Sequence, residues 1–204
     1  CAYEGGLRAL GPAHYGRGRY ALGHDQVGGL PEGGADLIRK MDELGIILDA
    51  THLSEGCFFE ALDLFEGTVW ASHSNCRALF PGMDATEAQR HLADDTIEEI
   101  ARRGGVIGIN LYSRFLTTNP PPARAQLRDV IAHIEHICTI TGSKAHVALG
   151  SDADGGFPAT RLPEGINQAR DYPRLAESLR NAGWNDEEIA GFCSENWLRF
   201  WRGD

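Results

Sequence analysis

Five short apolar runs recur along the chain, and each is followed by polar or glycine-rich residues. They cover positions 7–10, 46–50, 68–72, 106–111 and 146–150. The run GIILD, at 45–49, is apolar up to its last residue and rich in β-branched side chains, as is typical of a parallel strand covered on both faces. The pattern predicts five parallel β-strands.

Amphipathic segments between these runs predict helices. In segment 35–45 apolar residues repeat at spacings of four and three, and Gly45 provides a stop. Ser54 is predicted to cap the next helix, and Asp94 and Asp95 begin another, since acidic residues favour the first turn. Further helices are predicted around 131–137, at 172–182 and at 186–201.

Two segments interrupt this alternation. Residues 14–34 are rich in glycine, and residues 117–126 contain three consecutive prolines, which regular structure does not accommodate. Both are predicted to be loops, and we expect the segments 15–34 and 117–126 to form walls or lids over a site.

Strands that alternate with helices predict an α/β protein with a parallel sheet. Such a sheet is either open or closed as a barrel of the (β/α)8 TIM-barrel type. A closed barrel of this type has eight strands, whereas the sequence shows five. We therefore expect an incomplete barrel of about five β/α units, and we treat residues 1–204 as one domain.

Composition narrows the choice of partners. The 204 residues carry a formal net charge of −10, which argues against nucleic acid or an anionic membrane as the partner. No apolar run approaches the length of a membrane span, and no signal peptide is visible, so a cytoplasmic location is expected, with the true N-terminus left open. Five widely spaced cysteines indicate free thiols of a reducing compartment, although a secreted protein with two disulfides remains an alternative.

Residues that bind metals or move protons stand where the predicted strands end. His52, His73 and Asp152 each follow a strand, and His14 follows the run at 7–10. Because the chemistry of such barrels lies at the C-terminal ends of the strands, these side chains are expected to meet at one rim. Histidine nitrogen suits zinc, and a carboxylate can bind the metal or act as a base. The pattern predicts a metal site.

The other candidates have simpler interpretations. Arg90 precedes an acidic helix start, where an arginine is usually solvated or paired with a carboxylate. Asp154 is expected to serve turn chemistry beside Asp152. The sequence indicates no basic partner that would convert a cysteine to the thiolate, which disfavours a cysteine nucleophile. The remaining histidines are expected at the surface or in packing: His24, His91, His133, His136 and His146.

Taken in order, these segments resemble the renal (membrane) dipeptidase family, the zinc peptidases of family M19. MDELGIILDATHLS resembles the family pattern LGxxxDLSHxS, and VWASHSNCRAL resembles PxxxSHS. HVALGSDADG is similar to HxxxGSDFDG, SENWLRFW to GxNxLRxF, and LRALGPAHYG to xRxLTLTH. The resemblance spans nearly the whole chain and corresponds to the C-terminal part of the family's barrel.

The resemblance implies a role for each matching residue. His52 and His73 match the two histidine ligands of one zinc, and Asp152 matches the aspartate that binds the other zinc and handles the catalytic proton. His14 matches a substrate-contacting histidine, and Arg90 matches the arginine that binds the substrate's terminal carboxylate, a task that suits its forked donors. The function implied is hydrolysis of dipeptides by a metal-activated hydroxide, with two zinc ions in a complete site.

The chain departs from the family pattern at its beginning. The first zinc ligands of the family, an HxD pair, and its bridging glutamate come from strands upstream of anything in this sequence. His24-Asp25 is not an HxD pair, and Glu4 does not stand in the matching context. A site without these ligands is expected to hold metal weakly.

Three explanations of this departure are open. The sequence is part of a longer enzyme, which we favour; or a second chain supplies the ligands; or the chain is a non-catalytic member that binds small peptides. A different amidohydrolase-type metal hydrolase is a further alternative. Members of the family are commonly dimers, so a homodimer is expected by resemblance.

Overall fold

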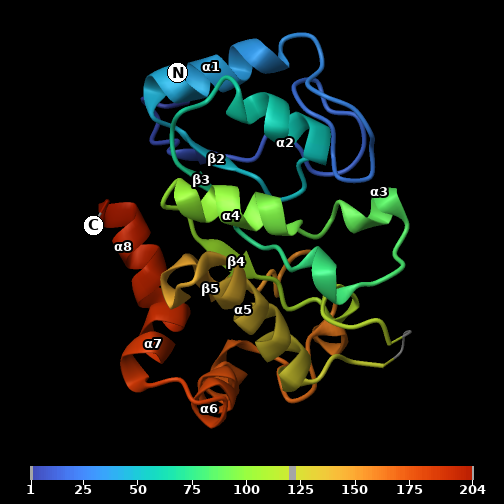
Figure 1. Ribbon diagram of the computed structural model, residues 1–204, viewed down its shortest axis with the longest axis vertical. Helices are drawn as coiled ribbons and strands as arrows, with labels where there is room; N and C mark the ends of the chain where they lie inside the picture. Colours follow the sequence, from blue (N-terminus) through green and yellow to red (C-terminus); the bar gives the residue numbers. More distant parts are fainter. Residues whose placement is uncertain (1, 120–122, 204) are drawn as a thin grey trace.

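The computed structural model describes residues 2–119 and 123–203 (Figure 1). Its strands are β1 (Ala9–Leu10), β2 (Ile47–Asp49), β3 (Val69–Trp70), β4 (Ile107–Ile109) and β5 (Val147–Leu149). Each strand lies inside one of the apolar runs, so the five predicted strands are confirmed. All are shorter than predicted, because the residues after each run turn into the loops that carry the candidate site.

The five strands follow one another in sequence order. β1, β2 and β3 form one parallel sheet, and β4 and β5 form a parallel pair. A parallel bridge between Ala71 and Ile107 joins the two, with the Gly108 amide donating to the Ala71 carbonyl at 2.8 Å. Parallel neighbours in strict sequence order form the wall of a β/α barrel, and β1 and β5 are the edges of this wall in the described part of the chain.

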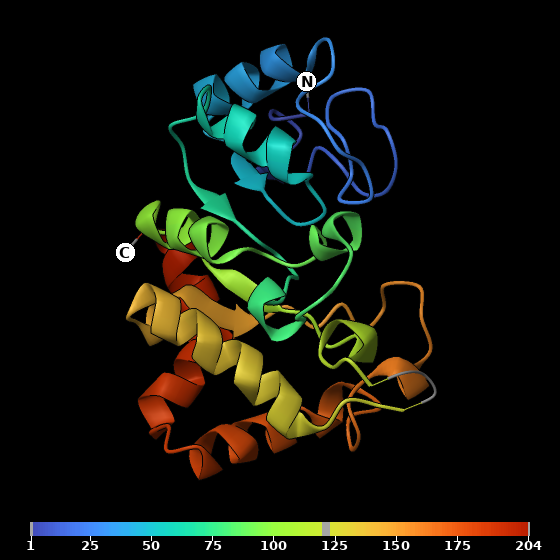
Figure 2. The ribbon, with the colours of Figure 1, turned by 45° about the vertical axis from the view of Figure 1, so that its right-hand side comes forward.

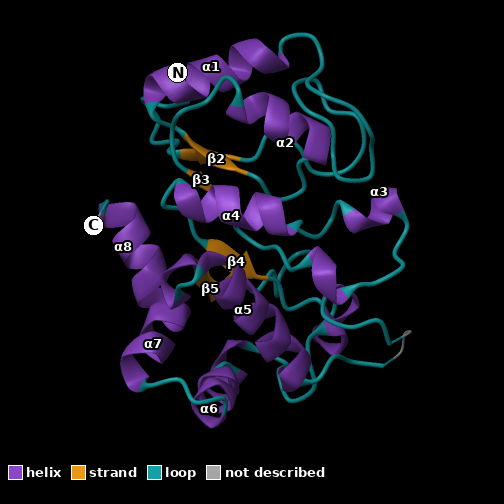
Figure 3. Cartoon of the chain, viewed as in Figure 1, coloured by secondary structure: helices purple, strands orange, loops and turns teal. Residues whose placement is uncertain are grey.

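The helices are α1 (Gly34–Leu44), α2 (Glu55–Leu62), α3 (Ala85–Ala88), α4 (Asp94–Arg102), α5 (Leu127–Thr141), α6 (Pro173–Asn181), α7 (Asp186–Ala190) and α8 (Asn196–Arg202) (Figure 3). The two predicted helix caps are confirmed. The Ser54 hydroxyl accepts a hydrogen bond from the Cys57 amide, and Gly45 ends α1 in a left-handed conformation (φ 64°).

Two helical features differ from the predictions. The short helix α3 was not predicted; four residues are too few to show a helical period, and the Asp84 carboxylate caps it. The single helix predicted at 186–201 is α7 and α8 joined by a π-helical turn at Gly191–Glu195.

The core lies between the strands and the helices that cover one face of the sheet. Figure 2 shows α5 crossing β4 and β5. Leu48 on β2 and Ile107 on β4 are fully buried, as are Ile97 and Ile134 on α4 and α5. Burying a side chain of this size stabilises a fold by about 1.5–3 kcal/mol, so the covered face fixes the sheet that carries the site.

Side chains near the C-terminus bind the free edge of β5. Asn196 Nδ2 donates to the Val147 carbonyl at 2.7 Å, and Trp197 Nε1 donates to the Leu149 carbonyl at 3.0 Å. On α8, Phe200 stacks on Trp70 of β3. The motif SENWLRFW therefore satisfies edge carbonyls that would otherwise lack partners.

The two predicted loops have different structures. Segment 15–34 is largely irregular but includes isolated bridges, Arg17 with Leu22 and Gly23 with Leu53. In segment 117–126, residues 120–122 lie outside the described residues; Arg124 donates to the carbonyls of Leu162, Pro163 and Ile166. This part of the segment is fixed against 162–166. No helix in the described ranges is both long and apolar enough to cross a membrane.

Candidate metal and substrate site

The ends of the first three strands bring the predicted histidines together. The ring of His14, after β1, lies 4.3 Å from that of His52, after β2, measured between centroids. The centroid of His73, after β3, lies 5.1 Å from that of His52. The rim predicted from the sequence therefore forms.

His52 and His73 point the same type of nitrogen at each other. Their Nε2 atoms lie 3.1 Å apart. The opposite nitrogens are engaged elsewhere: His73 Nδ1 lies 2.8 Å from Ser72 Oγ, and His52 Nδ1 lies 3.1 Å from His24 Nδ1. Hydrogen bonds at Nδ1 orient the two rings and leave Nε2 as the nitrogen available to a ligand.

The backbone is unusual at two of the predicted residues. Among the described residues, His52 (φ 67°) and Asp152 (φ 53°) are the non-glycine residues with positive φ. A left-handed conformation costs an ordinary residue about 1–3 kcal/mol, and such residues cluster at functional sites. Each residue stands three positions after the end of a strand, β2 or β5, where the chain turns towards the rim.

A polar network ties the ends of β2 and β3 together. Asp49 Oδ1 accepts from the amides of Thr51 and Ser72, at 3.0 and 3.1 Å. Thr51 Oγ1 in turn accepts from the His73 amide at 3.2 Å. The sequence analysis did not assign these residues a role, although each stands within three positions of a predicted ligand.

Arg90 is buried beside the histidines, with 4% of its surface exposed. Its Nη2 donates to the His73 carbonyl at 3.1 Å, and its guanidinium lies 4.5 Å above the Phe115 ring. None of the ion pairs in the described ranges includes Arg90, and its Nε has no hydrogen-bond partner. Burial lowers the pKa of Arg90 to about 10. The prediction that Arg90 is solvated or paired with a carboxylate is therefore wrong.

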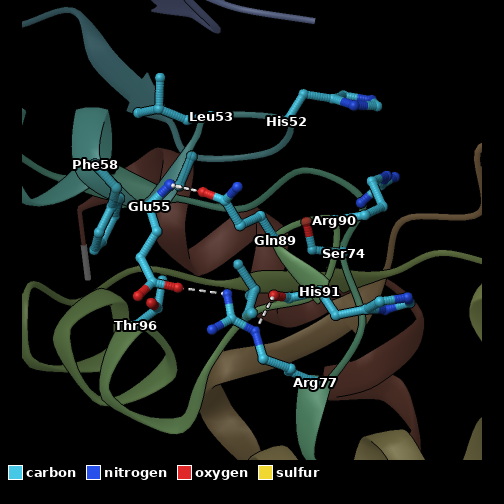
Figure 4. Close-up of a pocket in the computed structure, with 12 residues that line it drawn as sticks. His52, Leu53, Glu55, Phe58, Ser74, Arg77, Gln89, Arg90, His91 and Thr96 are labelled. Carbon is cyan, nitrogen blue, oxygen red and sulfur yellow. Dashed lines mark hydrogen bonds and ion pairs between the residues drawn. The ribbon is translucent and has the colours of Figure 1, made fainter. Parts of the chain in front are cut away.

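Figure 4 shows His52, Arg90 and His91 extending to the same side of a pocket. Gln89 fixes the segment before Arg90: its Oε1 accepts from the Glu55 amide at 2.9 Å, and its Nε2 donates to the His24 carbonyl at 3.3 Å. Gln89 thus links α2, the loop after β1 and the arginine.

His24 lies at the same rim, although no role was predicted for it. It was expected at the surface or in packing, and it is 5% exposed, with its ring in contact with His52 and Tyr15. No local spacing marks it, because it lies in an irregular loop that folds back onto the rim through the bridge between Gly23 and Leu53.

Asp152 lies at the same rim. Its Oδ2 accepts from Asn110 Nδ2 at 2.9 Å, which fixes the carboxylate at the ends of β4 and β5. Burial, followed by the charge of Arg90, lowers the pKa of His73, and the Asp152 carboxylate opposes this shift. Asp152 therefore acts electrostatically on the predicted ligand.

Burial also keeps His52 and His24 neutral. It lowers the pKa of His52 to about 2 and that of His24 to about 4, with Arg90 as the second cause in both. A neutral imidazole offers a lone pair to a metal, whereas a protonated one does not. His52 and His24 are thus held in the form that can donate a lone pair to a metal ion.

The donor set fits part of a metal site. Zinc–nitrogen bonds of about 2.0–2.1 Å place two ligating nitrogens roughly 3–3.4 Å apart, and the two Nε2 atoms lie 3.1 Å apart. Within the described ranges, however, no group of three histidine, cysteine or acidic side chains is arranged to hold a metal. His52 and His73 therefore bring two imidazole nitrogens to a spacing that suits one metal ion.

The remaining histidines are placed as expected, in packing or at the surface. His91 stacks on Phe80, His133 is buried on α5, and His136 bonds Asp94 at 2.7 Å. His146 contacts the Gly105 carbonyl at 2.8 Å. Four cysteines of the described residues are free thiols: Cys57, Cys76, Cys138 and Cys193. Cys1 lies outside the described residues.

Comparison with known proteins identifies the family. The sequence model of the family described as membrane dipeptidase (peptidase family M19) matches residues 2–203 of this chain. The chain belongs to this family.

Two uncharacterized dipeptidases of Schizosaccharomyces pombe are each 32% identical to this chain. One match covers 85% of this chain and 40% of the relative, and the other covers 98% and 47%. A metallo peptidase from Rhodobacter sphaeroides, solved with a phosphinate mimic of the dipeptide L-Ala-D-Ala, is 29% identical. It superposes with a TM-score of 0.84, covering 96% of this chain and 55% of that one. The chain therefore spans about half the length of these relatives, as a partial α/β fold.

Proposed function

We propose that this chain carries the C-terminal half of the active site of a metal-dependent dipeptidase. The observation that carries the proposal is the pair of Nε2 atoms of His52 and His73, 3.1 Å apart and beside the buried, unpaired guanidinium of Arg90. A position for a metal ion next to a guanidinium that can bind an anion suits a dipeptide. The metal position would face the peptide carbonyl, and the guanidinium would face the terminal carboxylate. The dipeptide mimic bound to the Rhodobacter sphaeroides relative supports this substrate class.

Each residue has a task in this proposal. Arg90 binds the terminal carboxylate and so orients the peptide bond over the rim, because a guanidinium holds a carboxylate in two places. Asp152, fixed by Asn110, holds the proton that the leaving amine requires. His14, at the edge of the rim, contacts the substrate near the reacting carbonyl.

His52 and His73 would hold one metal ion through Nε2. Zinc is the metal proposed, and when bound it supplies Lewis acidity and an activated water. The remaining ligands would come from the part of the barrel that this chain does not span, and we extend the family's homodimer to this chain as part of the same proposal.

A dipeptide-binding protein without turnover is the second candidate, because the described residues supply two metal ligands rather than a full set. The test is incubation of a protein that carries this chain together with the remaining part of the barrel, with dilute zinc and L-Ala-D-Ala, followed by chromatography of the products. Free alanine that disappears in His52→Ala and in Arg90→Met supports the dipeptidase. If the dipeptide binds without forming products and Arg90→Met weakens this binding, the result supports the binding protein. If Arg90→Met leaves dipeptide affinity unchanged, the result contradicts both candidates.

A further inference from the structure

A second cavity opens beside the proposed carboxylate site. Its volume is about 320 Å³, and Tyr15, Met83, Tyr112 and Phe115 form much of its wall. Arg90 also lines this cavity, so the cavity adjoins the proposed carboxylate site. Pockets for small ligands have volumes of about 300–1,000 Å³; this one is large enough for one bulky side chain.

The inner wall is aromatic. The rings of Tyr112 and Phe115 meet edge to face with centroids 4.9 Å apart, and Phe157 supports Tyr112 from behind at 4.6 Å. Arg90 lies over the Phe115 ring, which holds the guanidinium in place through a cation–π contact. Met83 adds a flexible apolar side chain that adapts to the shape of a ligand.

The charges at the rim of this cavity are largely compensated. Glu87 and Arg114 pair at 3.7 Å, with side chains that are 64% and 66% exposed. Asp25 accepts from the Gly16 amide at 2.6 Å. Arg90 is the one buried charged side chain among the cavity's lining residues, so the interior offers a cation at one end and aromatic surface beyond it.

From this arrangement we propose that the cavity receives the side chain of the dipeptide's C-terminal residue and selects apolar, aromatic side chains. The inference rests on the proposed function, since it takes Arg90 as the carboxylate anchor. The carboxylate and the side chain leave the same Cα atom, so a carboxylate held by Arg90 places its side chain at the mouth of the cavity. An aromatic ring there would bury apolar surface against Tyr112 and Met83.

Titration calorimetry of the whole chain with three dipeptides, Ala-Phe, Ala-Ala and Ala-Asp, tests this inference. Ala-Phe should bind at least about tenfold more tightly than Ala-Ala, and Ala-Asp more weakly than either. Tyr112→Ala should bring the ratio of Ala-Phe to Ala-Ala affinity towards one. Tyr20→Ala, which alters a partly exposed tyrosine outside the cavity lining, is the matched control and should leave this ratio unchanged.

The outcomes separate the two proposals. If no dipeptide binds, the proposed function fails and the cavity assignment with it. If Ala-Phe and Ala-Ala bind equally, or Ala-Asp binds most tightly, the dipeptide site stands and the aromatic selectivity is overturned. Should Tyr112→Ala fail to fold, Met83→Ala on the opposite wall gives the same comparison, and an unchanged ratio there also overturns the selectivity.

Discussion

His24 Nδ1 lies 3.1 Å from His52 Nδ1, on the side of the His52 ring opposite the nitrogen that faces His73. In such a contact one nitrogen donates and the other accepts. If His52 uses Nε2 as a ligand, its Nδ1 carries the hydrogen, and His24 accepts through Nδ1. His24 thus fixes the tautomer and the orientation of His52.

The first prediction concerns this contact. His24→Phe fills similar space but removes the acceptor, so zinc affinity should fall about 10–100-fold, the usual effect of losing such a partner. His24→Asn retains a carbonyl acceptor and should recover part of the loss. Zinc titration by calorimetry measures both, with His146→Gln, away from the rim, as the control. Equal affinities in the wild type and His24→Phe would contradict the assignment.

The second prediction separates the role of Arg90 in binding from any role in folding. Its guanidinium is buried without a carboxylate partner, and replacing an uncompensated buried charge with an apolar group is often neutral or stabilising. Arg90→Met should therefore keep or raise the free energy of unfolding in urea, while affinity for Ala-Ala falls at least about tenfold. Affinity for the dipeptide amide, which lacks the carboxylate, should change little. A parallel loss for the amide would argue against carboxylate recognition.

The third prediction concerns pH. Burial lowers the pKa of His91 to about 2, from 6.5, so the unfolded chain binds a proton at this residue before the folded chain does. The free energy of unfolding should therefore fall as the pH drops below about 6.5, with a slope near 1.4 kcal/mol per pH unit for one such histidine. His24, His52, His73 and His133 shift in the same direction and add to the effect.

His91→Phe tests this contribution. Its ring lies against Phe80 with centroids 4.2 Å apart, so phenylalanine can occupy the place without a titrating group. Urea unfolding at pH 7.5 and 5.5 should show a smaller loss of stability in the variant. An equal loss in both proteins would mean that His91 is not neutral in the folded state.

The fourth prediction concerns strand packing under the rim. A Cβ atom added at Gly108 would overlap the Ser72 carbonyl and approach Gly150 Cα at 2.9 Å. Gly108→Ala should therefore force β3, β4 and β5 apart and destabilise the fold by about 1–3 kcal/mol. At Gly11 a Cβ would meet Asp49 at an ordinary 3.6 Å, so Gly11→Ala is the matched control. Thermal unfolding measures both; equal midpoints would refute the close approach.

Much of this architecture could be read from the sequence because it rests on local signals. The apolar runs predicted the five strands. Ser54 predicted the start of α2, and Gly45 predicted the end of α1. His14, His52, His73 and Asp152 could be predicted to lie near one another because the carboxyl ends of neighbouring parallel strands meet at one edge of a sheet. The contribution of His24 could not be found in this way, because a long irregular loop places it and its partner is 28 positions away.

Arg90 shows the other limit of sequence reasoning. The residue was identified by resemblance, but its burial and its lack of a carboxylate partner arise from tertiary packing against Phe115 and the His73 backbone. The aromatic cavity has the same origin, because Tyr15, Met83 and Tyr112 come from three separate loops. Contacts between distant loops leave no periodic pattern in a sequence.

The central claim is that His52 and His73 hold one metal ion together. Zinc titration of the wild type, His52→Ala and His73→Ala tests it most directly. We predict one zinc position in the wild type and a similar, large loss of affinity in each variant, because each removes one of two ligands of the same ion. Zinc binding that survives both substitutions unchanged would contradict the claim.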